Sequence, residues 1–497
     1  MLKSGAGNIS PASGTGSPER KRCPRGSRYP VPFPVRRRHV REKARYYLWH
    51  RHEYGCMDVE EYARVHLAAG EDEASVVQNL AGRITEIKHS RPEYTMAFAR
   101  AVVEEVKNTK NLSGDFFSFE PAGVKMGEFG VGSRGKGDFF AHRQIARIIG
   151  KTSASVGVDE MDDAGAVKAG GDYIVCTVDG MHSRLSDYPF LAGFHVTRAT
   201  LRDLYVMGAK PVMLFSDIHV ADDGDVAKIF DYTAGITTVG EAMNVPLVTG
   251  STLRIGGDMV LGSRLTGCVG AVGVARHLTA RKSTQAGDVL LMTEGAGGGT
   301  IATAAIYSGF PEVVEETINL NFLTTCEALI RSPVLDRIHA MTDVTNGGLR
   351  GDIFEMTETA QCRMVVREED AKALVNPRVQ KMLDALEIDF LGVSLDALLI
   401  VAPKADAPEI IRTIRTTGVG CQEIGYVEKG KPASVLIRDG KETDFEPRFR
   451  ESAYTPVKKV VDTDVPAFEE MQKGVLKASE AAIAKKKRVL DRLKKNR

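Results

Sequence analysis

The stretch that decides the fold runs from Asp159 to Pro211 and reads DEMDDAGAVKAGGDYIVCTVDGMHSRLSDYPFLAGFHVTRATLRDLYVMGAKP. Acidic residues stand at the ends of its hydrophobic segments in three places: Asp162 with Asp163, Asp179, and Asp203. Mg²⁺ prefers oxygen ligands, keeps several waters and takes the rest of its shell from substrate phosphates. Small residues beside each acidic place let a polyphosphate approach the backbone. The stretch therefore predicts a site for Mg²⁺ and phosphate.

A fourth acidic place, Asp343, lies much later in the chain, within Met341–Leu349. A single aspartate after a strand is more often a helix N-cap or a turn residue than a metal ligand. Four separated places, each with small neighbours, favour one shared cation site instead. We therefore predict that five residues bind Mg²⁺, namely Asp162, Asp163, Asp179, Asp203 and Asp343.

Four separated motifs carry a resemblance to a known family. They are residues 162–167 (Asp-Asp-Ala-Gly-Ala-Val), 177–180 (Thr-Val-Asp-Gly), 203–211 (Asp-Leu-Tyr-Val-Met-Gly-Ala-Lys-Pro) and 342–349 (Thr-Asp-Val-Thr-Asn-Gly-Gly-Leu). In order and spacing they resemble the AIR synthetase superfamily, with its PurM-like fold, over about residues 125–430. Its members include AIR synthetase, selenophosphate synthetase, thiamine-monophosphate kinase and the hydrogenase maturation dehydratase.

The resemblance implies an α/β (α+β) fold of two domains. An N-terminal αβ domain over residues 121–278 would pair its sheet with a second copy in a homodimer. A C-terminal αβ domain over residues 279–430 would complete each site, with ATP bound across the dimer seam. The family's shared chemistry is activation of an oxygen, sulfur or selenium atom by ATP-derived phosphate. The resemblance thus implies ATP and Mg²⁺ as cofactors and a small-molecule acceptor as substrate.

A glycine-rich loop, residues 127–137, precedes a predicted helix from His142 to Ile149. Backbone N–H groups that glycine frees can cradle phosphate, and a lysine supplies the counter-charge. In selenophosphate synthetases the corresponding loop carries a Cys or selenocysteine three residues before a catalytic Lys, and Ser133 and Lys136 have that spacing. A serine hydroxyl is a far poorer soft nucleophile than a thiolate. The candidate catalytic residues are Lys136 and Ser133, and the candidate phosphate contacts in this loop are Gly130, Gly132 and Gly135.

Two later turns provide further candidate phosphate contacts. The segment Leu247–Thr252 resembles the strand and turn at which the family contacts nucleotide or substrate, which makes Thr252 a candidate. Residues 295–300 lie between a predicted strand, Val289–Met292, and a predicted helix, Ile301–Tyr307. A glycine loop before a helix N-terminus is a ready anion site. The candidates in this loop are Gly297 and Gly298.

The amino-acid composition restricts the class of protein to which the chain can belong. Of 497 residues, 43% are hydrophobic and 26% are charged, as in ordinary globular domains. No apolar run reaches the ~18 residues that a membrane span requires, and the net charge of +1 gives no case for nucleic acid. Seven scattered cysteines without a CxxC pair indicate reduced thiols. We therefore expect a cytoplasmic protein without a membrane or nucleic-acid partner.

Both ends of the chain extend beyond the family pattern. Residues 1–56 are rich in Gly, Ser, Pro and Arg without an amphipathic period, which predicts a disordered basic leader. Met57 resembles a natural beginning, so an over-extended start is an open alternative. Residues 57–120 predict two or three amphipathic helices. Residues 431–497 are predicted to form an extension that ends in a basic helix.

The preferred function is ATP-dependent phosphoryl transfer to, or activation of, a small acceptor. Residues 341–345 and 283–288 resemble the selenophosphate synthetase branch, whereas Ser133 argues against true selenophosphate synthesis. A divergent, sulfur-directed relative is therefore our first interpretation. Three alternatives stay open: an AIR synthetase-like cyclo-ligase of purine synthesis, a non-catalytic ATP-binding maturation or regulatory protein, and an RNA-associated protein that uses both basic ends.

Overall fold

A computed structural model describes residues 59–88, 90–132, 135–255, 262–345, 347–449, 451, 454–461 and 465–495. The predicted leader over residues 1–56 and the candidate Ser133 lie outside these residues. In the part of the chain that is described, no helix combines the length and the apolarity that a membrane crossing demands.

The first three helices form a small bundle with a core of its own. They are α2 (Val59–Ala68), α3 (Glu73–Lys88) and α4 (Pro92–Thr109). Val76, Leu80 and Ile84 of α3 are buried against Val102 and Val103 of α4. These residues recur at helical spacing, so one stripe of each helix is apolar and packs inward. The predicted amphipathic helices are present.

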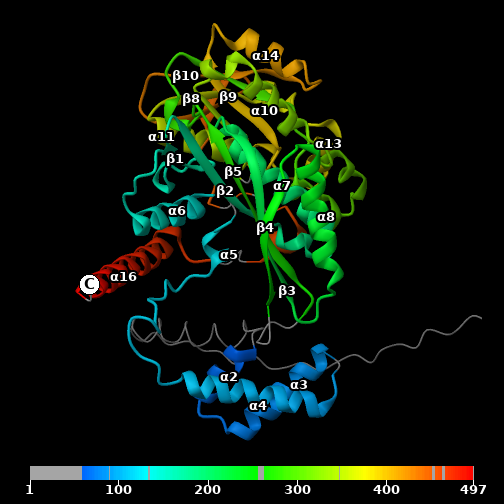
Figure 1. The fold of residues 1–497 in the computed structure, drawn as a ribbon, viewed down its shortest axis with the longest axis vertical. Helices are drawn as coiled ribbons and strands as arrows, with labels where there is room; N and C mark the ends of the chain where they lie inside the picture. The colour runs from blue at the N-terminus through cyan, green and yellow to red at the C-terminus, as the bar shows by residue number, and fades with distance from the viewer. Residues whose placement is uncertain are drawn as a thin grey trace, which may run out of the picture. The chain divides into compact units, whose positions relative to one another are not determined.

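The first sheet has five strands in the order β1-β2-β5-β3-β4. The strands are β1 (Gly165–Ala169), β2 (Asp172–Gly180), β3 (Lys210–Ala221), β4 (Leu247–Ile255) and β5 (Leu265–Ala275). Only the β3–β4 pair is parallel. Helices α7 (Pro189–Val206) and α8 (Ala227–Ala242) lie together along this sheet (Figure 1).

The two faces of the first sheet differ in burial. Along β2, Val175 is fully buried, whereas Ile174 is 41% and Val178 59% exposed. The strand register places Val274 and Leu253, which are also exposed, on the same face as Ile174. Because successive side chains of a strand point to opposite faces, one face packs on α7 and the other presents apolar side chains outward.

The second sheet has seven strands in the order β12-β11-β8-β10-β6-β9-β7. The strands are β6 (Asp288–Thr293), β7 (Ala340–Val344), β8 (Arg363–Arg367), β9 (Ala397–Pro403), β10 (Cys421–Glu428), β11 (Ala433–Arg438) and β12 (Lys441–Asp444). The accompanying helices are α9 (Gly299–Ser308), α10 (Asn321–Arg331), α11 (Gly348–Ala360), α12 (Glu368–Lys372), α13 (Pro377–Ala385) and α14 (Ala407–Arg415). Together the two sheets and their helices give the mixed α/β architecture that the motifs imply.

The second sheet continues beyond residue 430, the expected end of the C-terminal domain. β11 pairs in parallel with β8, and β12 pairs with β11. Val435 and Leu436 are buried in this extension. Polar residues on either side of these short apolar runs hide the strand pattern, so the boundary at 430 falls too early for the sheet.

The remaining elements lie around the glycine-rich loop and in the connections. Helices α5 (Met126–Phe129) and α6 (Lys136–Ile149) take up the two ends of residues 127–137, so the helix predicted from His142 begins at Lys136. Helices α15 (Pro456–Val460) and α16 (Phe468–Lys495) are the last helices of the described chain. Single 3-10 turns span Val158–Glu160, Ser183–Asp187, Arg281–Ser283, Pro311–Val313, Glu315–Thr317, Pro333–Arg337 and Phe390–Gly392.

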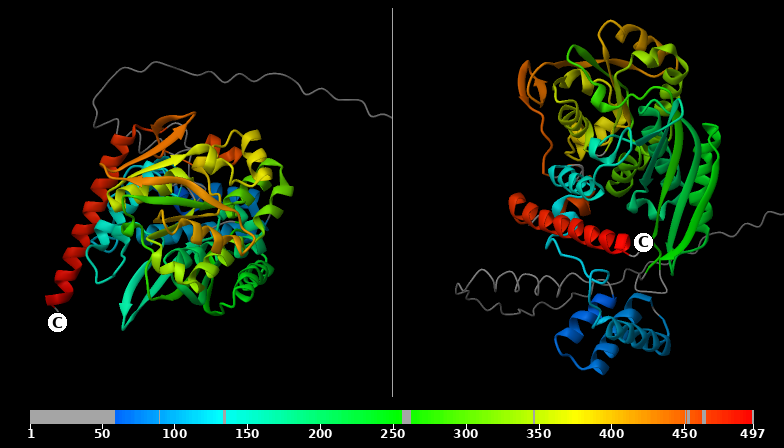
Figure 2. Two further views of the ribbon diagram at one scale, coloured as in Figure 1. Left: turned by 90° about the horizontal axis from the view of Figure 1, so that it is seen from above. Right: turned by 60° about the vertical axis from the view of Figure 1, so that its left-hand side comes forward.

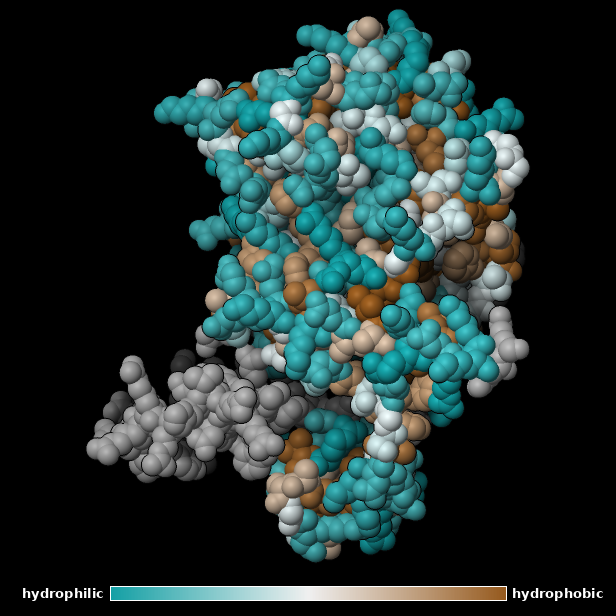
Figure 3. Space-filling model, turned by 90° about the vertical axis from the view of Figure 1, so that its left-hand side faces the viewer, coloured by the Kyte–Doolittle hydropathy of each residue, from teal (hydrophilic) through white to brown (hydrophobic). Residues whose placement is uncertain are grey.

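Helix α16 packs beside α6 (Figures 1 and 2). The Phe468 ring stacks on Phe129 with centroids 5.7 Å apart. Lys486 Nζ donates to the carbonyl oxygen of Ile148 at 2.7 Å, at the C-terminal end of α6. A lysine there satisfies carbonyls that the helix leaves unpaired. The basic terminal helix is therefore docked along part of its length and exposed over its last turns. The face of the molecule in Figure 3 is mostly hydrophilic, with apolar patches between.

Close packing of α7 on α8 depends on glycine. A Cβ atom on Gly235 of α8 would lie 2.2 Å from the carbonyl oxygen of Phe190 on α7. We expect Gly235→Ala to lower the free energy of unfolding by about 1–3 kcal/mol, because an extra methyl group in a packed contact forces the backbone apart. Urea denaturation followed by circular dichroism measures the change.

Gly82→Ala is the matched control for this substitution. Gly82 lies in α3, and its added Cβ would meet nothing within 4 Å. Alanine there should leave stability unchanged or raise it by up to about 1 kcal/mol. Equal destabilisation by both substitutions would contradict the packing argument.

Candidate functional site

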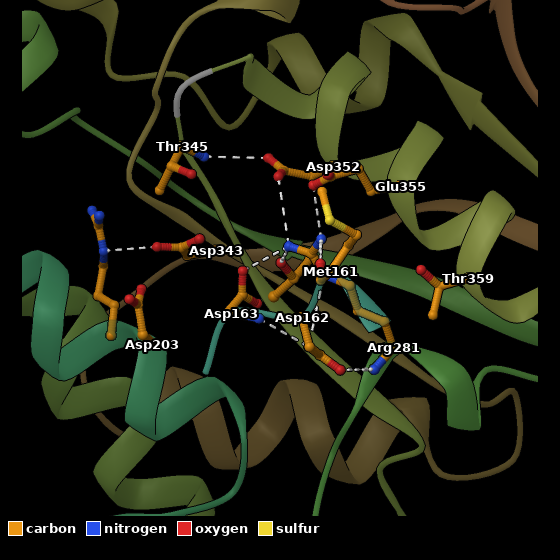
Figure 4. Close-up of polar contacts among 12 residues, drawn as sticks. Met161, Asp162, Asp163, Asp203, Arg281, Asp343, Thr345, Asp352, Glu355 and Thr359 are labelled. Carbon is orange, nitrogen blue, oxygen red and sulfur yellow. Dashed lines mark hydrogen bonds and ion pairs between the residues drawn. The ribbon is translucent and has the colours of Figure 1, made fainter. Parts of the chain in front are cut away.

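One cavity of about 150 Å³ collects residues from both sheets. Acidic residues reach it from the segment before β1, from the end of β2, from α7 and from β7. The start of α9 supplies glycine backbone, and α7 supplies histidine and arginine. The lining includes all five predicted aspartates together with Gly298, His182, His195, Arg198 and Arg202. The structure therefore brings the separated acidic motifs to one place (Figure 4).

Several predicted phosphate-binding residues do not line this cavity. Lys136 is absent from the lining, and its Nζ donates to Glu446 Oε2 at 2.9 Å. A Cβ on Gly135 would lie 2.2 Å from the carbonyl oxygen of Phe449. Close packing on residues 448–449 thus accounts for this glycine without phosphate. Among the other candidates, Gly130, Gly132, Thr252 and Gly297 are also outside the lining residues.

Gly297 does not line the cavity, but its backbone conformation lets the chain turn into α9. Its φ of +77° is a conformation that glycine adopts readily, and a Cβ there would lie 2.1 Å from Ile301. Glycine at this position therefore lets the chain turn tightly into the helix. The neighbouring Gly298 is the N-cap residue of α9 and does line the cavity.

The carboxylates in the cavity are buried and repel one another. Burial and the neighbouring Asp179, Asp343 and Asp163 raise the pKa of Asp203 well above its ordinary value. Burial, opposed in part by Arg281, raises the pKa of Asp163 to about 7. Burial also raises the pKa of Asp162. A positive charge is therefore favourable at this end of the cavity.

Thr177 orients one of these carboxylates. Its Oγ1 donates a hydrogen bond to Asp203 Oδ2 at 2.8 Å. Thr177 lies on β2, and Asp203 lies in the last turns of α7. The hydrogen bond therefore joins the strand that supplies Asp179 to the helix that supplies Asp203.

Arg281 supplies the counter-charge for Asp162 and Asp163. Its backbone N–H donates to Asp162 Oδ2 at 3.0 Å, and its Nη2 donates to Asp163 Oδ1 at 2.6 Å. The same guanidinium donates to Glu355 Oε2 at 2.9 Å and to Thr342 Oγ1 at 2.7 Å. Figure 4 shows this arginine among the acidic side chains. Burial opposes the charge, but the surrounding carboxylates raise the pKa of Arg281 well above its usual value.

Two further arginines lie one turn apart on α7. Arg198 and Arg202 both form ion pairs with Asp396. Arg202 Nε also lies 3.1 Å from Asp343 Oδ2. Arg198 Nη1 donates to the carbonyl oxygen of Thr317. The cavity therefore has cationic as well as anionic walls.

Two histidines in the lining, the buried His195 and the half-buried His182, carry no charge at neutral pH. Burial, with Lys458 and Arg202 nearby, lowers the pKa of His182 to about 4. Burial, with His182 and Arg202 nearby, lowers the pKa of His195 to about 3. His195 Nε2 lies 3.3 Å from Thr317 Oγ1. Both rings therefore offer hydrogen-bonding atoms without adding to the positive charge.

Sequence reasoning missed these basic residues. Arg198 and Arg202 have i, i+4 spacing in the helix that carries Asp203, so the helical period could have placed both on one face. The partner Asp396 lies outside the four motifs and gives no signal of its own. Arg281 is separated from Asp162 by 119 residues, and no sequence pattern connects them.

The arrangement of the carboxylates limits how the cavity could hold Mg²⁺. Within the described residues, no group of three or more His, Cys, Asp or Glu side chains is placed to enclose a metal ion. Asp163 Oδ2 is nevertheless buried without a hydrogen-bond partner among them. Mg²⁺ is commonly held by one or two carboxylates, several waters and substrate phosphates. The aspartates thus fit a Mg²⁺ ion that arrives with phosphate, and they do not form a closed protein cage.

Comparison with known families identifies the fold. The family model "AIR synthase related protein, N-terminal domain" matches residues 161–275, and its C-terminal counterpart matches residues 285–438. Together the matches span more than half of the chain. The chain belongs to the AIR synthase related family. The superfamily resemblance and the two-domain α/β fold predicted from the motifs are thereby confirmed.

The relatives that the chain resembles are described by different activities or by none. The chain is 50% identical over 455 residues to an uncharacterized protein of Methanocaldococcus jannaschii, covering 89% of the chain and 99% of the relative. It is 27% identical over 314 residues to a selenide, water dikinase of Myxococcus xanthus, covering 57% and 87%. It is 28% identical over 245 residues to the carbamoyl dehydratase HypE of Rhodobacter capsulatus, covering 48% and 70%.

The Arg281 network gives a direct test of how the cavity is held together. We expect Arg281→Met to lower the free energy of unfolding by about 3–5 kcal/mol, because removing one partner leaves buried charges uncompensated. Urea denaturation at pH 7 followed by circular dichroism measures this loss.

Lys282→Met is the control on the adjacent residue. Lys282 pairs with Glu160 at 2.8 Å, but its side chain is 45% exposed. An exposed ion pair contributes at most about 1 kcal/mol. Similar stability losses in the two variants would show that the buried network does not hold the cavity.

Proposed function

We propose that this chain catalyses ATP-dependent, Mg²⁺-assisted phosphoryl transfer to, or activation of, a small acceptor. One observation carries the proposal: five aspartates from four separated segments line one cavity beside the N-terminus of α9. Closely spaced acidic groups attract a divalent cation, which brings its phosphate ligands with it, and a helix N-terminus attracts an oxyanion. Relatives named selenide, water dikinase and carbamoyl dehydratase support a nucleotide-using reaction.

Each part of the cavity has a role in this mechanism. Asp162, Asp163, Asp179, Asp203 and Asp343 would hold Mg²⁺. When bound, Mg²⁺ would neutralise phosphate charge and assist the departing phosphate. Thr177 fixes the orientation of Asp203. Gly298 leaves the backbone at the N-cap of α9 open to an oxyanion, whereas Gly299 packs against the ring of His182.

Lys136 is proposed to stabilise the transferring phosphoryl group. In the described structure its Nζ pairs with Glu446, and its side chain is 45% exposed. Lys136 would therefore have to exchange Glu446 for phosphate during the reaction. Ser133 remains a candidate that only the sequence motif supports.

A second candidate function is a non-catalytic ATP-binding regulator. The position of Lys136 outside the cavity lining favours it, because a protein that only binds nucleotide does not need this lysine at the phosphate. The two functions predict different outcomes when ATP and acceptors are added together.

Turnover by the full chain distinguishes the two. Phosphorus NMR with ATP and Mg²⁺ is run against selenide, sulfide, thiamine monophosphate and formylglycinamidine ribonucleotide. We expect acceptor-dependent product, and we expect Asp203→Asn and Lys136→Met each to slow it by on the order of 10²-fold or more. Asp217→Asn is the control, since Asp217 pairs with His219 on β3 and is not a lining residue.

Wild-type turnover by the Asp203→Asn protein would overturn the site assignment. ATP binding without product from any acceptor would favour the regulator. Turnover that survives Lys136→Met but not Asp203→Asn would keep the cavity and remove the lysine from the mechanism.

We further propose that the exposed apolar face of the first sheet pairs with a second copy of the chain. Ile174, Val178, Leu253 and Val274 occupy that face. Contiguous exposed apolar surface commonly marks a protein interface. We also propose a cytoplasmic location, which the five free cysteines among the described residues support.

Sedimentation velocity tests the dimer. We expect the wild-type chain to sediment as two copies and Val178→Lys as one, because a buried lysine without a partner opposes association. Phe230→Lys is the control, because Phe230 is 68% exposed but lies on α8. A monomeric wild type, or dissociation by both substitutions alike, would contradict this interface.

A further inference from the structure

The candidate cavity has two chemically different ends. The acidic end holds the predicted Mg²⁺ ligands. The other end is cationic. It is formed by Arg198 and Arg202 on α7 and by the N-cap and first turn of α9, residues 298–300. Binding of Mg²⁺ and phosphate involves the acidic end and leaves the two arginines without a role.

Both arginines are buried. Arg198 is 1% and Arg202 is 7% exposed. Long cationic side chains are almost never buried to this degree unless they are paired. Their principal shared partner is one carboxylate, Asp396, and Arg202 also approaches Asp343. Asp396 carries one negative charge for two guanidinium groups, and Asp343 belongs to the mutually repelling acidic group.

The arginines retain hydrogen-bonding capacity. Arg198 Nε is buried and has no hydrogen-bond partner among the described residues. The same is true of His195 Nδ1, and both residues line the cavity. A buried donor without a partner costs on the order of 1–3 kcal/mol. An anion beside Arg198 Nε would satisfy this donor. The neutral His195 ring faces the Thr317 hydroxyl, which already donates to the carbonyl oxygen of Val314, so His195 Nε2 donates to Thr317 and Nδ1 is left as an acceptor.

Helix α9 adds a third feature at the same end. It is ten residues long, and its N-cap residue Gly298 has no side chain with which to cap it. A Cβ on Gly298 would lie 3.8 Å from Arg202 Nη1 and 3.9 Å from Asp396 Oδ1, so the Arg202–Asp396 pair adjoins the helix start and Asp396 is the carboxylate with which an incoming anion competes. Helix N-termini attract anions through their exposed N–H groups and dipole.

We propose that Arg198, Arg202 and the N-terminus of α9 form a subsite for an oxyanion group on the acceptor. This inference rests on the proposed function and narrows its substrate class to molecules that carry a carboxylate or phosphate. The anion docks at the cationic end, which leaves the rest of the acceptor directed toward the Mg²⁺–phosphate end. Planar guanidinium groups suit both oxyanions because they donate two parallel hydrogen bonds.

The experiment measures binding of inorganic phosphate and of acetate to the full chain by titration calorimetry in EDTA. Without Mg²⁺ the acidic end repels anions, so binding reports the cationic end alone. We expect Arg202→Gln to weaken binding of the preferred anion by about 10- to 100-fold, the worth of a charged hydrogen bond. Whether phosphate or acetate binds more tightly identifies the group. Arg254→Gln, at an exposed arginine on β4, is the control.

A variant with the opposite expected effect guards against misfolding. Asp396→Asn removes the carboxylate that competes for both guanidinium groups, so it should strengthen anion binding. A purely structural ion pair would give weaker folding in both variants and no anion binding in the wild type. Thermal unfolding confirms that each titrated variant is folded.

Three outcomes overturn the subsite: no binding of either anion to the wild type, unchanged affinity in folded Arg202→Gln, or weaker binding in folded Asp396→Asn. A separate titration with a non-hydrolysable ATP analogue and Mg²⁺ tests the proposed function itself. If the wild-type chain binds the anion but not the nucleotide, the proposed function is contradicted. If it binds the nucleotide but neither anion, the subsite is contradicted.

Discussion

The buried guanidinium of Arg281 is the interaction on which the cavity depends. It joins Asp162 and Asp163, which precede the first sheet, to Thr342 on β7 and Glu355 on α11 of the second sheet. A buried charge is tolerated only when opposite charges and hydrogen bonds surround it. One side chain therefore links the two aspartates that precede β1 to the second sheet.

The cavity combines charges that would be costly alone. Asp203 and Asp163 are buried close to other carboxylates, while Arg198 and Arg202 share Asp396 at the other end. Separating the two signs within one small space lets a ligand with both a cation and an anion complement it. ATP with Mg²⁺ and an anionic acceptor form such a ligand set.

Much of this arrangement follows from the sequence. Acidic residues at the ends of apolar segments predicted that distant aspartates would meet, and all five line one cavity. The predicted strand Val289–Met292 and helix Ile301–Tyr307 lie within β6 and α9. The arginines were not predicted, because their partner Asp396 is brought to them only by the folding of the second sheet.

The glycine-rich loop shows a second limit of structure prediction from sequence. Its composition suggested phosphate binding, yet Gly135 is required where the chain passes the backbone of Phe449. Glycine serves close backbone approach to protein and to phosphate alike, and sequence cannot distinguish the two. Likewise, the short apolar run of β11 within polar surroundings gave no strand signal, so the second sheet was ended too early.

The contact between Lys136 and Glu446 links residues 310 positions apart, and the backbone N–H of Lys136 donates to the carbonyl oxygen of Arg448. At roughly 5–20 residues per second, a ribosome needs about 15–60 s to make the intervening chain. Throughout that interval the loop has been synthesised without the segment that packs on it. A growing chain would therefore carry an incompletely packed loop until residues 446–448 have been made, and in that interval chaperones could bind it.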